Sequence, residues 1–191
     1  MPKLIPKNFY NRPTLQVAQD LLGCFLVRKI NGEIVRAMIV ETEGYFGYKD
    51  KASHASRGKT DRNEPMFWEG GITYVYLVYG MHSLLNIVTE KENYPAAVLI
   101  RAVDFNWEEF SSNDKKGNGP GKLTKILEID RTLNKQKIYN KKNNLWLEES
   151  IRDIKKNEIV KTKRVGIDYA GEYRDKPWRF YLADNKNVSK K

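Results

Sequence analysis

The dipeptide Asn31-Gly32 separates two runs rich in apolar and β-branched residues, 24–30 and 33–43. Asn-Gly favours a two-residue β-turn because both turn residues must adopt a positive φ angle. The pattern therefore predicts a β-hairpin. The two-residue period of its second strand places two carboxylates at the end of an apolar face. That face carries Val35, Ala37, Ile39, Glu41 and Glu43.

Similar patterns along the rest of the chain predict an α+β fold with a largely antiparallel sheet and peripheral helices. We expect strands over 72–79, 83–90, 96–105, 145–147, 160–169 and 178–182, and helices over 13–22 and about 120–129. Pro13 and Gly23 mark the two ends of the first helix. Residues 44–71 lack regular patterning and are expected to form a long surface loop.

Length and composition narrow the class of protein. With 191 residues, 40% of them hydrophobic, we expect a single domain over 1–191 whose last residues, about 184–191, form a frayed tail. No apolar run reaches the roughly 18 residues that a membrane span needs. A single cysteine, Cys24, excludes an internal disulfide, and with two histidines it cannot complete the zinc site of nucleobase deaminases. These features predict an intracellular protein without a metal site, cytoplasmic or nucleoid-associated in a bacterium and nuclear in a eukaryote.

The net charge of +10 is confined to one half of the chain. Residues 1–110 contain 13 basic and 13 acidic side chains, whereas residues 111–191 contain 21 basic and 11 acidic ones. A concentration of this kind is typical of proteins that bind a polyanion, with nucleic acid as the leading candidate. Solvated basic loops give the same composition, so charge alone leaves the partner open.

The two carboxylates of the predicted hairpin are followed directly by Tyr45 and Phe46. Hydrolysis of a bond to a sugar needs a carboxylate that deprotonates water or stabilises an oxocarbenium-like centre, in a site without bulk water. Aromatic side chains beside such a carboxylate can stack on a base. A second aromatic run, 74–79, lies on another predicted strand, although packing in a β core produces the same pattern.

Tyr79 stands beside Gly80 at the expected tip of a hairpin, a place where large aromatic side chains are rare. Such a side chain is suited to enter a DNA groove and replace a displaced base.

The segment Gly119-Pro-Gly-Lys122 precedes a predicted helix, where free N–H groups favour an anion such as phosphate. Asn86, within the apolar strand, is typical of a buried amide that satisfies a neighbour.

Nine stretches, in register along nearly the whole chain, resemble the alkyladenine (3-methyladenine) DNA glycosylase family. They are Gln19-Asp-Leu-Leu-Gly23, Ile39-Val-Glu-Thr-Glu-Gly-Tyr45, Asp50-Lys-Ala-Ser-His54, Thr60-Asp-Arg-Asn63 with Met66-Phe67, Tyr74-Val-Tyr-Leu-Val-Tyr-Gly80, Leu85-Asn86-Ile87, Ala97-Val-Leu-Ile-Arg-Ala102, Gly119-Pro-Gly-Lys-Leu123, and Arg164-Val-Gly166 through Ala170-Gly-Glu172 to Lys176-Pro-Trp-Arg-Phe-Tyr181. Residues 106–118 and 134–145 fit only loosely, which leaves their DNA contacts open. The resemblance implies a compact α+β domain with a curved antiparallel sheet, similar to the carboxy-terminal domain of methionyl-tRNA formyltransferase.

The resemblance also implies that the protein flips a damaged purine out of duplex DNA and hydrolyses its N-glycosidic bond, without a cofactor. Glu43 is the implied general base, held with Arg101 and the backbone carbonyl of Val165, whereas Glu41 is not the catalytic residue. The other implied site residues are Tyr45, His54 and Tyr76 around the flipped base, Asn86 at the pocket edge, Leu99 behind it, Tyr79 in the gap in the duplex, Met81 after it on the hairpin, and Lys122 near the DNA backbone.

A pocket lined by tyrosines should prefer a cationic alkylated purine, because aromatic faces attract cations. 3-Methyladenine and 7-methylguanine meet this condition. Neutral lesions such as hypoxanthine and ethenoadenine lack the positive charge, and hypoxanthine would need a proton on the leaving group, for which His54 is a candidate acid. We expect a monomer that acts on double-stranded DNA and has no membrane partner.

Two other functions remain open from the sequence. A nucleic-acid-binding module without catalysis would use the same sheet and basic half, but it leaves Glu43 unexplained. A lyase-type glycosylase would attack through a lysine Schiff base, which the many lysines do not exclude. Release of free base separates the first alternative from a glycosylase, and borohydride trapping on damaged DNA reveals the second.

Overall fold

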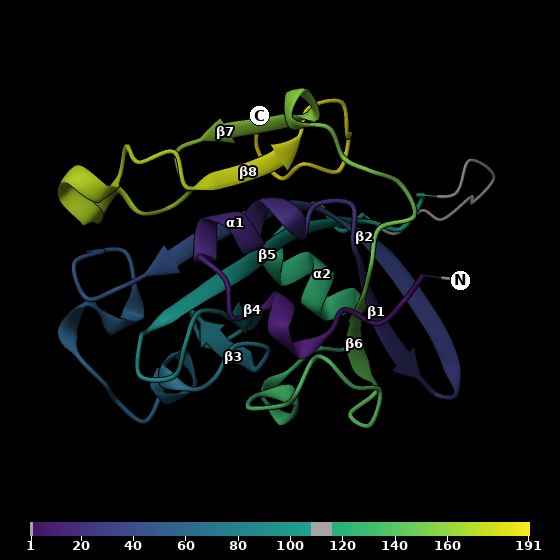
Figure 1. Ribbon diagram of the computed structural model, residues 1–191, viewed down its shortest axis with the longest axis horizontal. Coiled ribbons are helices and arrows are strands. Elements are labelled where there is room, and N and C mark those ends of the chain that lie inside the picture. Colours follow the sequence, from purple (N-terminus) through teal and green to yellow (C-terminus); the bar gives the residue numbers. More distant parts are fainter. Residues whose placement is uncertain (1, 108–115) are drawn as a thin grey trace.

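Eight strands form one antiparallel sheet in the computed structural model, which describes residues 2–107 and 116–191 (Figure 1). They are β1 (Phe25–Ile30), β2 (Glu33–Phe46), β3 (Thr73–Val78), β4 (His82–Val88), β5 (Ala96–Asp104), β6 (Leu145–Glu148), β7 (Ile159–Thr162) and β8 (Arg179–Leu182). Six of them follow the order β3-β4-β5-β2-β1-β6, while β8 pairs with β2 and β7. The predicted α+β class with an antiparallel sheet is confirmed.

The β1–β2 hairpin turns at the predicted dipeptide. Ile30 pairs with Glu33, and the two residues between them have positive φ angles, 49° for Asn31 and 89° for Gly32. The second strand continues to Phe46 because it has partners along its whole length: β1 first, then β8, with β5 on the other side. This long central strand carries both candidate carboxylates into the interior.

Within the described ranges, two short α-helices cover the sheet. They are α1 (Thr14–Asp20) and α2 (Pro120–Ile126), accompanied by the 3₁₀ turns η1 (Lys7–Phe9), η2 (His54–Arg57), η3 (Glu64–Phe67), η4 (Arg131–Leu133), η5 (Lys156–Glu158) and η6 (Asp168–Tyr173). The first helix is shorter than predicted, because it ends at Asp20 with Leu21 as its C-cap, and Gly23, at φ 82°, lies three residues beyond its end. Within the described residues no helix is both long enough and apolar enough to cross a bilayer.

The main core lies between α1 and the centre of the sheet. Val17 and Ala18 of α1 pack with Ile39 of β2 and Ile100 of β5, and all four are fully buried. Every residue of β5 is buried. The Thr42 hydroxyl donates a hydrogen bond to the Ala18 carbonyl at 2.7 Å, which fixes the helix against β2 at the height of the carboxylates.

The predicted strand over 160–169 is shorter in the structure, because β7 ends at Thr162. The following residues leave the sheet edge, and the Arg164 side chain turns inward to a buried carboxylate, Asp50. Gly166 then takes a φ of 75°, which a strand does not allow. The segment 163–167 is therefore an irregular connection that runs past the end of β2.

The predicted polar connection over 107–119 includes residues 108–115, which lie outside the described residues.

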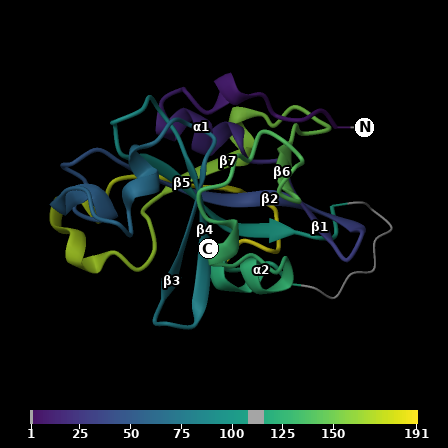
Figure 2. The same cartoon turned by 90° about the horizontal axis from the view of Figure 1, so that it is seen from below.

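The β3–β4 hairpin projects from the body of the molecule beside α2 (Figure 2). Thr124 of α2 donates a hydrogen bond from its hydroxyl to the Ser83 carbonyl at 2.7 Å, and α2 packs along β4. The helix thus supports one side of the hairpin while its tip remains free.

The last residues of the sequence pack against the sheet, although their composition predicted a frayed tail over 184–191. Val188 is buried, and the Ser189 N–H donates a hydrogen bond to Glu41 at 2.6 Å. The Asn185 amide reaches Asp104 of β5 at 2.8 Å. These contacts join the tail to β2 and β5, and the pattern of nearby residues could not show them because the partners lie far away in the chain.

Candidate active site

Strand register brings four side chains into one row across the sheet. Tyr74 of β3 pairs with Asn86 of β4. Asn86 in turn pairs with Leu99 of β5, and Leu99 pairs with Glu43 of β2. Directly paired residues on neighbouring strands lie on the same face of a sheet. The fold therefore places an aromatic ring, an amide and a carboxylate on one surface.

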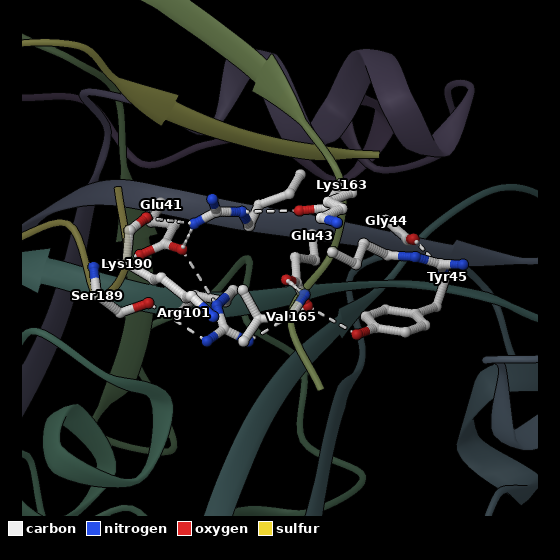
Figure 3. A network of polar contacts seen from close by, with 11 residues as sticks. Glu41, Glu43, Gly44, Tyr45, Arg101, Lys163, Val165, Ser189 and Lys190 are labelled. Atoms are coloured by element: carbon white, nitrogen blue, oxygen red, sulfur yellow. Dashed lines mark hydrogen bonds and ion pairs between the residues drawn. The ribbon is translucent and has the colours of Figure 1, made fainter. Parts of the chain in front are cut away.

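Glu43 is fully buried and has two hydrogen-bond donors and one ion-pair partner (Figure 3). The Val165 N–H donates to Oε1 at 2.8 Å, and the Tyr45 hydroxyl donates to Oε2 at 2.7 Å. Arg101 Nη1 lies 3.4 Å from Oε2. A buried carboxylate is tolerated only with such partners. Each oxygen of the Glu43 carboxylate therefore accepts one hydrogen bond within the fold.

Arg101 reaches the carboxylates from an irregular point of the sheet. Ala102 pairs with Glu41 and Ile100 with Thr42, so Arg101 is an extra residue of β5 between them. β-Bulges of this kind re-aim a side chain and are common beside active sites. Here the bulge directs the guanidinium to both Glu41 and Glu43.

Glu41 occupies a different environment from Glu43. It is fully buried between Arg101, whose Nε lies 3.1 Å from Oε1, and Arg179, whose Nη1 lies 2.7 Å from the same oxygen. Its other oxygen accepts the hydrogen bond from Ser189. Both oxygens of Glu41 are therefore used within the fold, and it does not line the cavity described below.

A second buried ion pair fixes the segment that carries Val165. Arg164 makes two contacts with Asp50, at 2.6 and 2.8 Å, and neither side chain is exposed. The Arg164 guanidinium also lies 4.5 Å from the centre of the Tyr45 ring and 4.9 Å from that of Trp178. One arginine thus positions both groups that donate hydrogen bonds to Glu43.

A cavity of about 610 Å³ opens next to Glu43, in the range typical of small-molecule sites. Glu43 itself does not reach the cavity surface, but its three partners Tyr45, Arg101 and Val165 do. The cavity wall includes all the base-pocket residues implied by the resemblance: Tyr45, His54, Tyr76, Asn86 and Leu99. It also includes Tyr79 of the hairpin tip, whereas Met81 and Lys122 lie outside it.

The resemblance implied a role for the Val165 carbonyl, whereas the contact with Glu43 is made by the Val165 N–H. Sequence reasoning also missed several cavity residues, among them Arg62, Tyr74, Ile167 and Tyr169. Arg62 lies 5.2 Å from the centre of the Tyr76 ring and donates a hydrogen bond to the Leu77 carbonyl at 3.1 Å. Its place in the stretch Thr60-Asp-Arg-Asn63 was the one signal that could have identified it.

His54 packs against two tyrosines at the cavity wall. Its Nδ1 is 2.8 Å from the Tyr74 hydroxyl, and its ring meets the Tyr76 ring edge to face, with 4.5 Å between centres. The residue is partly exposed, on the open side of the cavity. Burial of its packed side, helped by the positive charge of Arg62, lowers the pKa of His54 from 6.5 to about 4. The imidazole is therefore neutral at pH 7 and a poor proton donor.

We expect His54 to stay neutral from pH 8 down to about pH 5, because its pKa lies below this range. The ¹⁵N shifts of its ring, followed by NMR across this range, report the charge directly. Excision by His54→Gln should retain the pH dependence of the unaltered protein over the same interval. A charge transition of His54 near pH 6.5 would restore it as a candidate acid.

Tyr79 occupies the free tip of the β3–β4 hairpin with 89% of its surface exposed. Its φ angle is 53°, a region that bulky residues rarely adopt and that costs of order 1–3 kcal/mol. The neighbouring Met81 is 75% exposed. The protein therefore holds two apolar side chains in water, one of them with a strained backbone, beside the cavity.

Lys122 lies on α2, next to the hairpin, and contacts the Asn118 side chain at 2.9 Å. The helix has seven residues, and the phosphate site predicted before it stays a prediction. Within the described residues, no group of three or more His, Cys, Asp and Glu side chains could hold a metal ion. The absence of a metal or cofactor requirement stays a prediction.

Comparison with known proteins identifies the family to which this arrangement belongs. Residues 8–186 match the family described as methylpurine-DNA glycosylase. The chain belongs to this family. The match spans nearly the whole fold, including both carboxylates, the bulge and the hairpin tip, and it confirms the resemblance drawn from the sequence.

Relatives in this family are similar over their full length. A protein of Methanocella arvoryzae is 47% identical over 197 residues, covering 98% of this chain and 96% of the relative. Proteins of Clostridium botulinum and Bdellovibrio bacteriovorus are 44% and 42% identical, each covering 98% of this chain and 100% of the relative. All three carry the provisional name 3-methyladenine DNA glycosylase. Membership of the methylpurine-DNA glycosylase family confirms the predicted enzyme class, a hydrolase of N-glycosyl bonds in DNA.

Proposed function

We propose that this methylpurine-DNA glycosylase takes alkylated purines, 3-methyladenine and 7-methylguanine first, out of duplex DNA and hydrolyses their N-glycosidic bonds. The observation that carries the proposal is the environment of Glu43. A buried carboxylate stands directly behind three residues of a tyrosine-lined cavity, and the exposed aromatic side chain of Tyr79 lines the same cavity.

In the proposed reaction Glu43 accepts a proton from a water while the water oxygen attacks C1′ of the flipped nucleotide. The bond between C1′ and N9 breaks, and its electron pair leaves with the purine. Arg101 and the Val165 N–H hold the carboxylate in the orientation that this step needs. General-base assistance of this kind contributes about 10²–10⁴-fold to the rate.

The cavity suits a purine that carries a positive charge. Aromatic faces attract cations, and five tyrosines line the wall, at positions 45, 74, 76, 79 and 169. Arg164 lies over the Tyr45 ring and Arg62 lies over the Tyr76 ring. A cationic alkylated purine also departs readily without a proton donor, which agrees with a neutral His54.

The cavity offers no amine for the alternative lyase chemistry. Among the described residues that line it there is no lysine, and the buried carboxylate of Glu43 lies directly behind its wall. A hydrolytic enzyme leaves an intact strand with an abasic site, whereas a Schiff-base enzyme is trapped by borohydride. We expect no trapped adduct.

Duplexes that each contain one lesion test the proposed specificity. Single-turnover rates for 7-methylguanine, ethenoadenine and hypoxanthine are to be measured in one sequence context, together with strand integrity. We expect the cationic base to be released fastest and the strand to remain unbroken. Faster release of neutral lesions than of 7-methylguanine would contradict the account of the pocket.

Tyr79→Ala is expected to lower lesion-specific binding while leaving the salt-dependent binding of undamaged DNA almost unchanged. The reason is that a side chain filling the gap in the stack stabilises only the flipped state. Titrations with damaged and undamaged duplexes at several salt concentrations measure both components.

Lys122→Ala is the matched control on the neighbouring helix. It should weaken the binding of both duplexes about equally and reduce the salt slope by about one unit, as expected for loss of one phosphate contact. Equal effects of the two substitutions on lesion specificity would contradict separate roles.

Asn86→Ser is expected to accelerate release of normal guanine more than release of hypoxanthine. Asn86 is buried at the cavity wall, and its amide nitrogen donates a hydrogen bond to the Tyr74 carbonyl at 3.2 Å. That bond keeps the side chain from moving aside for the exocyclic amino group at C2 of guanine, so a clash rejects the normal base. The ratio of single-turnover rates for the two bases measures the effect. An unchanged ratio in a folded, active variant would show that Asn86 only satisfies its neighbour.

A further inference from the structure

The tail segment, residues 187–191, contacts the ion network behind the active site without touching the base cavity (Figure 3). The Ser189 N–H donates to Glu41 Oε2 at 2.6 Å, and the Ser189 hydroxyl accepts from Arg101 Nη2 at 3.3 Å. The Lys190 carbonyl accepts from Arg179 Nη1 at 2.7 Å. Two residues of the tail therefore bind three side chains of the network, those of Glu41, Arg101 and Arg179.

The Arg101 guanidinium uses its three nitrogens for three different partners. Nε lies 3.1 Å from Glu41, Nη2 lies 3.3 Å from Ser189, and Nη1 lies 3.4 Å from Glu43. A guanidinium is rigid and planar, so fixing two of its nitrogens fixes the direction of the third. The charged contact with Glu41 is the shorter and stronger of the two that fix the guanidinium, so the direction of Nη1 toward Glu43 depends mainly on Glu41.

Glu41 links the tail to both arginines. Its Oε1 accepts from Arg101 and Arg179, whereas the N–H of Ser189 is the partner that the described residues offer to Oε2. Without that N–H a fully buried carboxylate oxygen would lack a donor, which is costly in a protein interior. The carboxylate would then turn toward other donors and shift both arginines.

We propose that the tail segment and Glu41 position Arg101 against Glu43, so that a part of the chain outside the base cavity sets the rate of base excision. The inference rests on the proposed function, in which Glu43 is the general base. Glu41 and Ser189 are positioning residues in this account, because neither touches the base or the reacting water. Displacement of a catalytic group by as little as 1 Å can cost on the order of 10²-fold in rate.

Two substitutions at one position separate the backbone contact from the hydroxyl contact. Ser189→Pro removes the N–H that binds Glu41, whereas Ser189→Ala retains it and removes only the hydroxyl. We expect Ser189→Pro to lower the single-turnover excision rate about 10- to 100-fold, with lesion affinity unchanged within about threefold. Ser189→Ala should keep the rate within about threefold. Deletion of residues 187–191, with deletion of Lys191 alone as its control, repeats the comparison should the proline variant not fold.

A second measurement does not depend on activity. The side-chain Nε–H of Arg101 should give a slowly exchanging NMR signal in the unaltered protein and in Ser189→Ala, and a fast-exchanging one in Ser189→Pro. Equal excision rates for the two Ser189 variants, or equal exchange of Arg101, would overturn the inference. Failure of the unaltered protein to release any base would instead overturn the proposed function, while the exchange measurement would still test the positioning of Arg101.

Discussion

Glu43→Gln is expected to lower single-turnover base excision by about 10²–10⁴-fold while lesion binding persists. The amide has nearly the size of the carboxylate and leaves the cavity wall unchanged, since Glu43 is fully buried behind Tyr45, Arg101 and Val165. It cannot accept a proton from water. Excision rates at saturating enzyme, with affinities measured separately on the same duplex, distinguish the two effects.

Two other carboxylates provide controls for this substitution. Glu148 is also buried and paired with Arg36 at 2.9 Å, but it lies on β6, far from the cavity along the sheet. Glu148→Gln should affect stability without changing the rate per folded molecule. Glu41→Gln should reduce the rate less than Glu43→Gln does, because Glu41 acts through Arg101. A greater loss in Glu41→Gln than in Glu43→Gln would contradict the assignment of the base.

Asp50→Ala is expected to lower the free energy of unfolding by about 3–5 kcal/mol, the usual cost of removing one partner from a buried ion pair. It would leave the Arg164 guanidinium without its carboxylate in a site where neither side chain is exposed. The stacked rings of Tyr45 and Trp178 cannot replace the two charged hydrogen bonds. Urea denaturation at pH 7, followed by tryptophan fluorescence, measures the change.

Asp175→Ala serves as the matched control, because it removes the same kind of partner from a solvent-exposed arginine. Arg174 and Asp175 are 2.9 Å apart, but about half of each side chain is exposed. Exposed ion pairs contribute little, so the free energy of unfolding should not change measurably. A similar loss in both variants would show that burial of the Asp50 pair has no special role.

Local signals predicted the elements that the structure confirms. The turn at Asn31-Gly32 depends on two residues, and the first helix, α1 (Thr14–Asp20), depends on the spacing of apolar residues within one segment. The β3–β4 hairpin was likewise predictable from residues that are close together in the sequence. Positions within one strand can be assigned to one face by counting only while the pairing stays regular. The register shift between Ile39 and Glu41 interrupts the predicted row, so the two-residue period does not carry unbroken from Val35 to Glu43.

The contacts that make the site are long-range, and the sequence could not supply them. The row from Tyr74 to Glu43 requires the register of four strands, and the Arg101 contact requires a bulge that no pattern in β5 reveals. The contacts of the tail are also long-range and could not be predicted from the sequence. The composition of the tail predicts fraying, yet the N–H of Ser189 satisfies a carboxylate 148 positions earlier. The resemblance supplied roles for residues, but the donor that Val165 presents to Glu43 is visible only in the fold.

Release of free 3-methyladenine from methylated duplex DNA, measured in single turnover with excess EDTA, tests the central claim most directly. The account predicts that the unaltered protein releases the base at full rate without any metal or cofactor, leaves an intact strand with an abasic site, and loses this activity in Glu43→Gln. Retention of the full rate in Glu43→Gln, or release that requires an added metal, would contradict hydrolysis by a water that Glu43 activates.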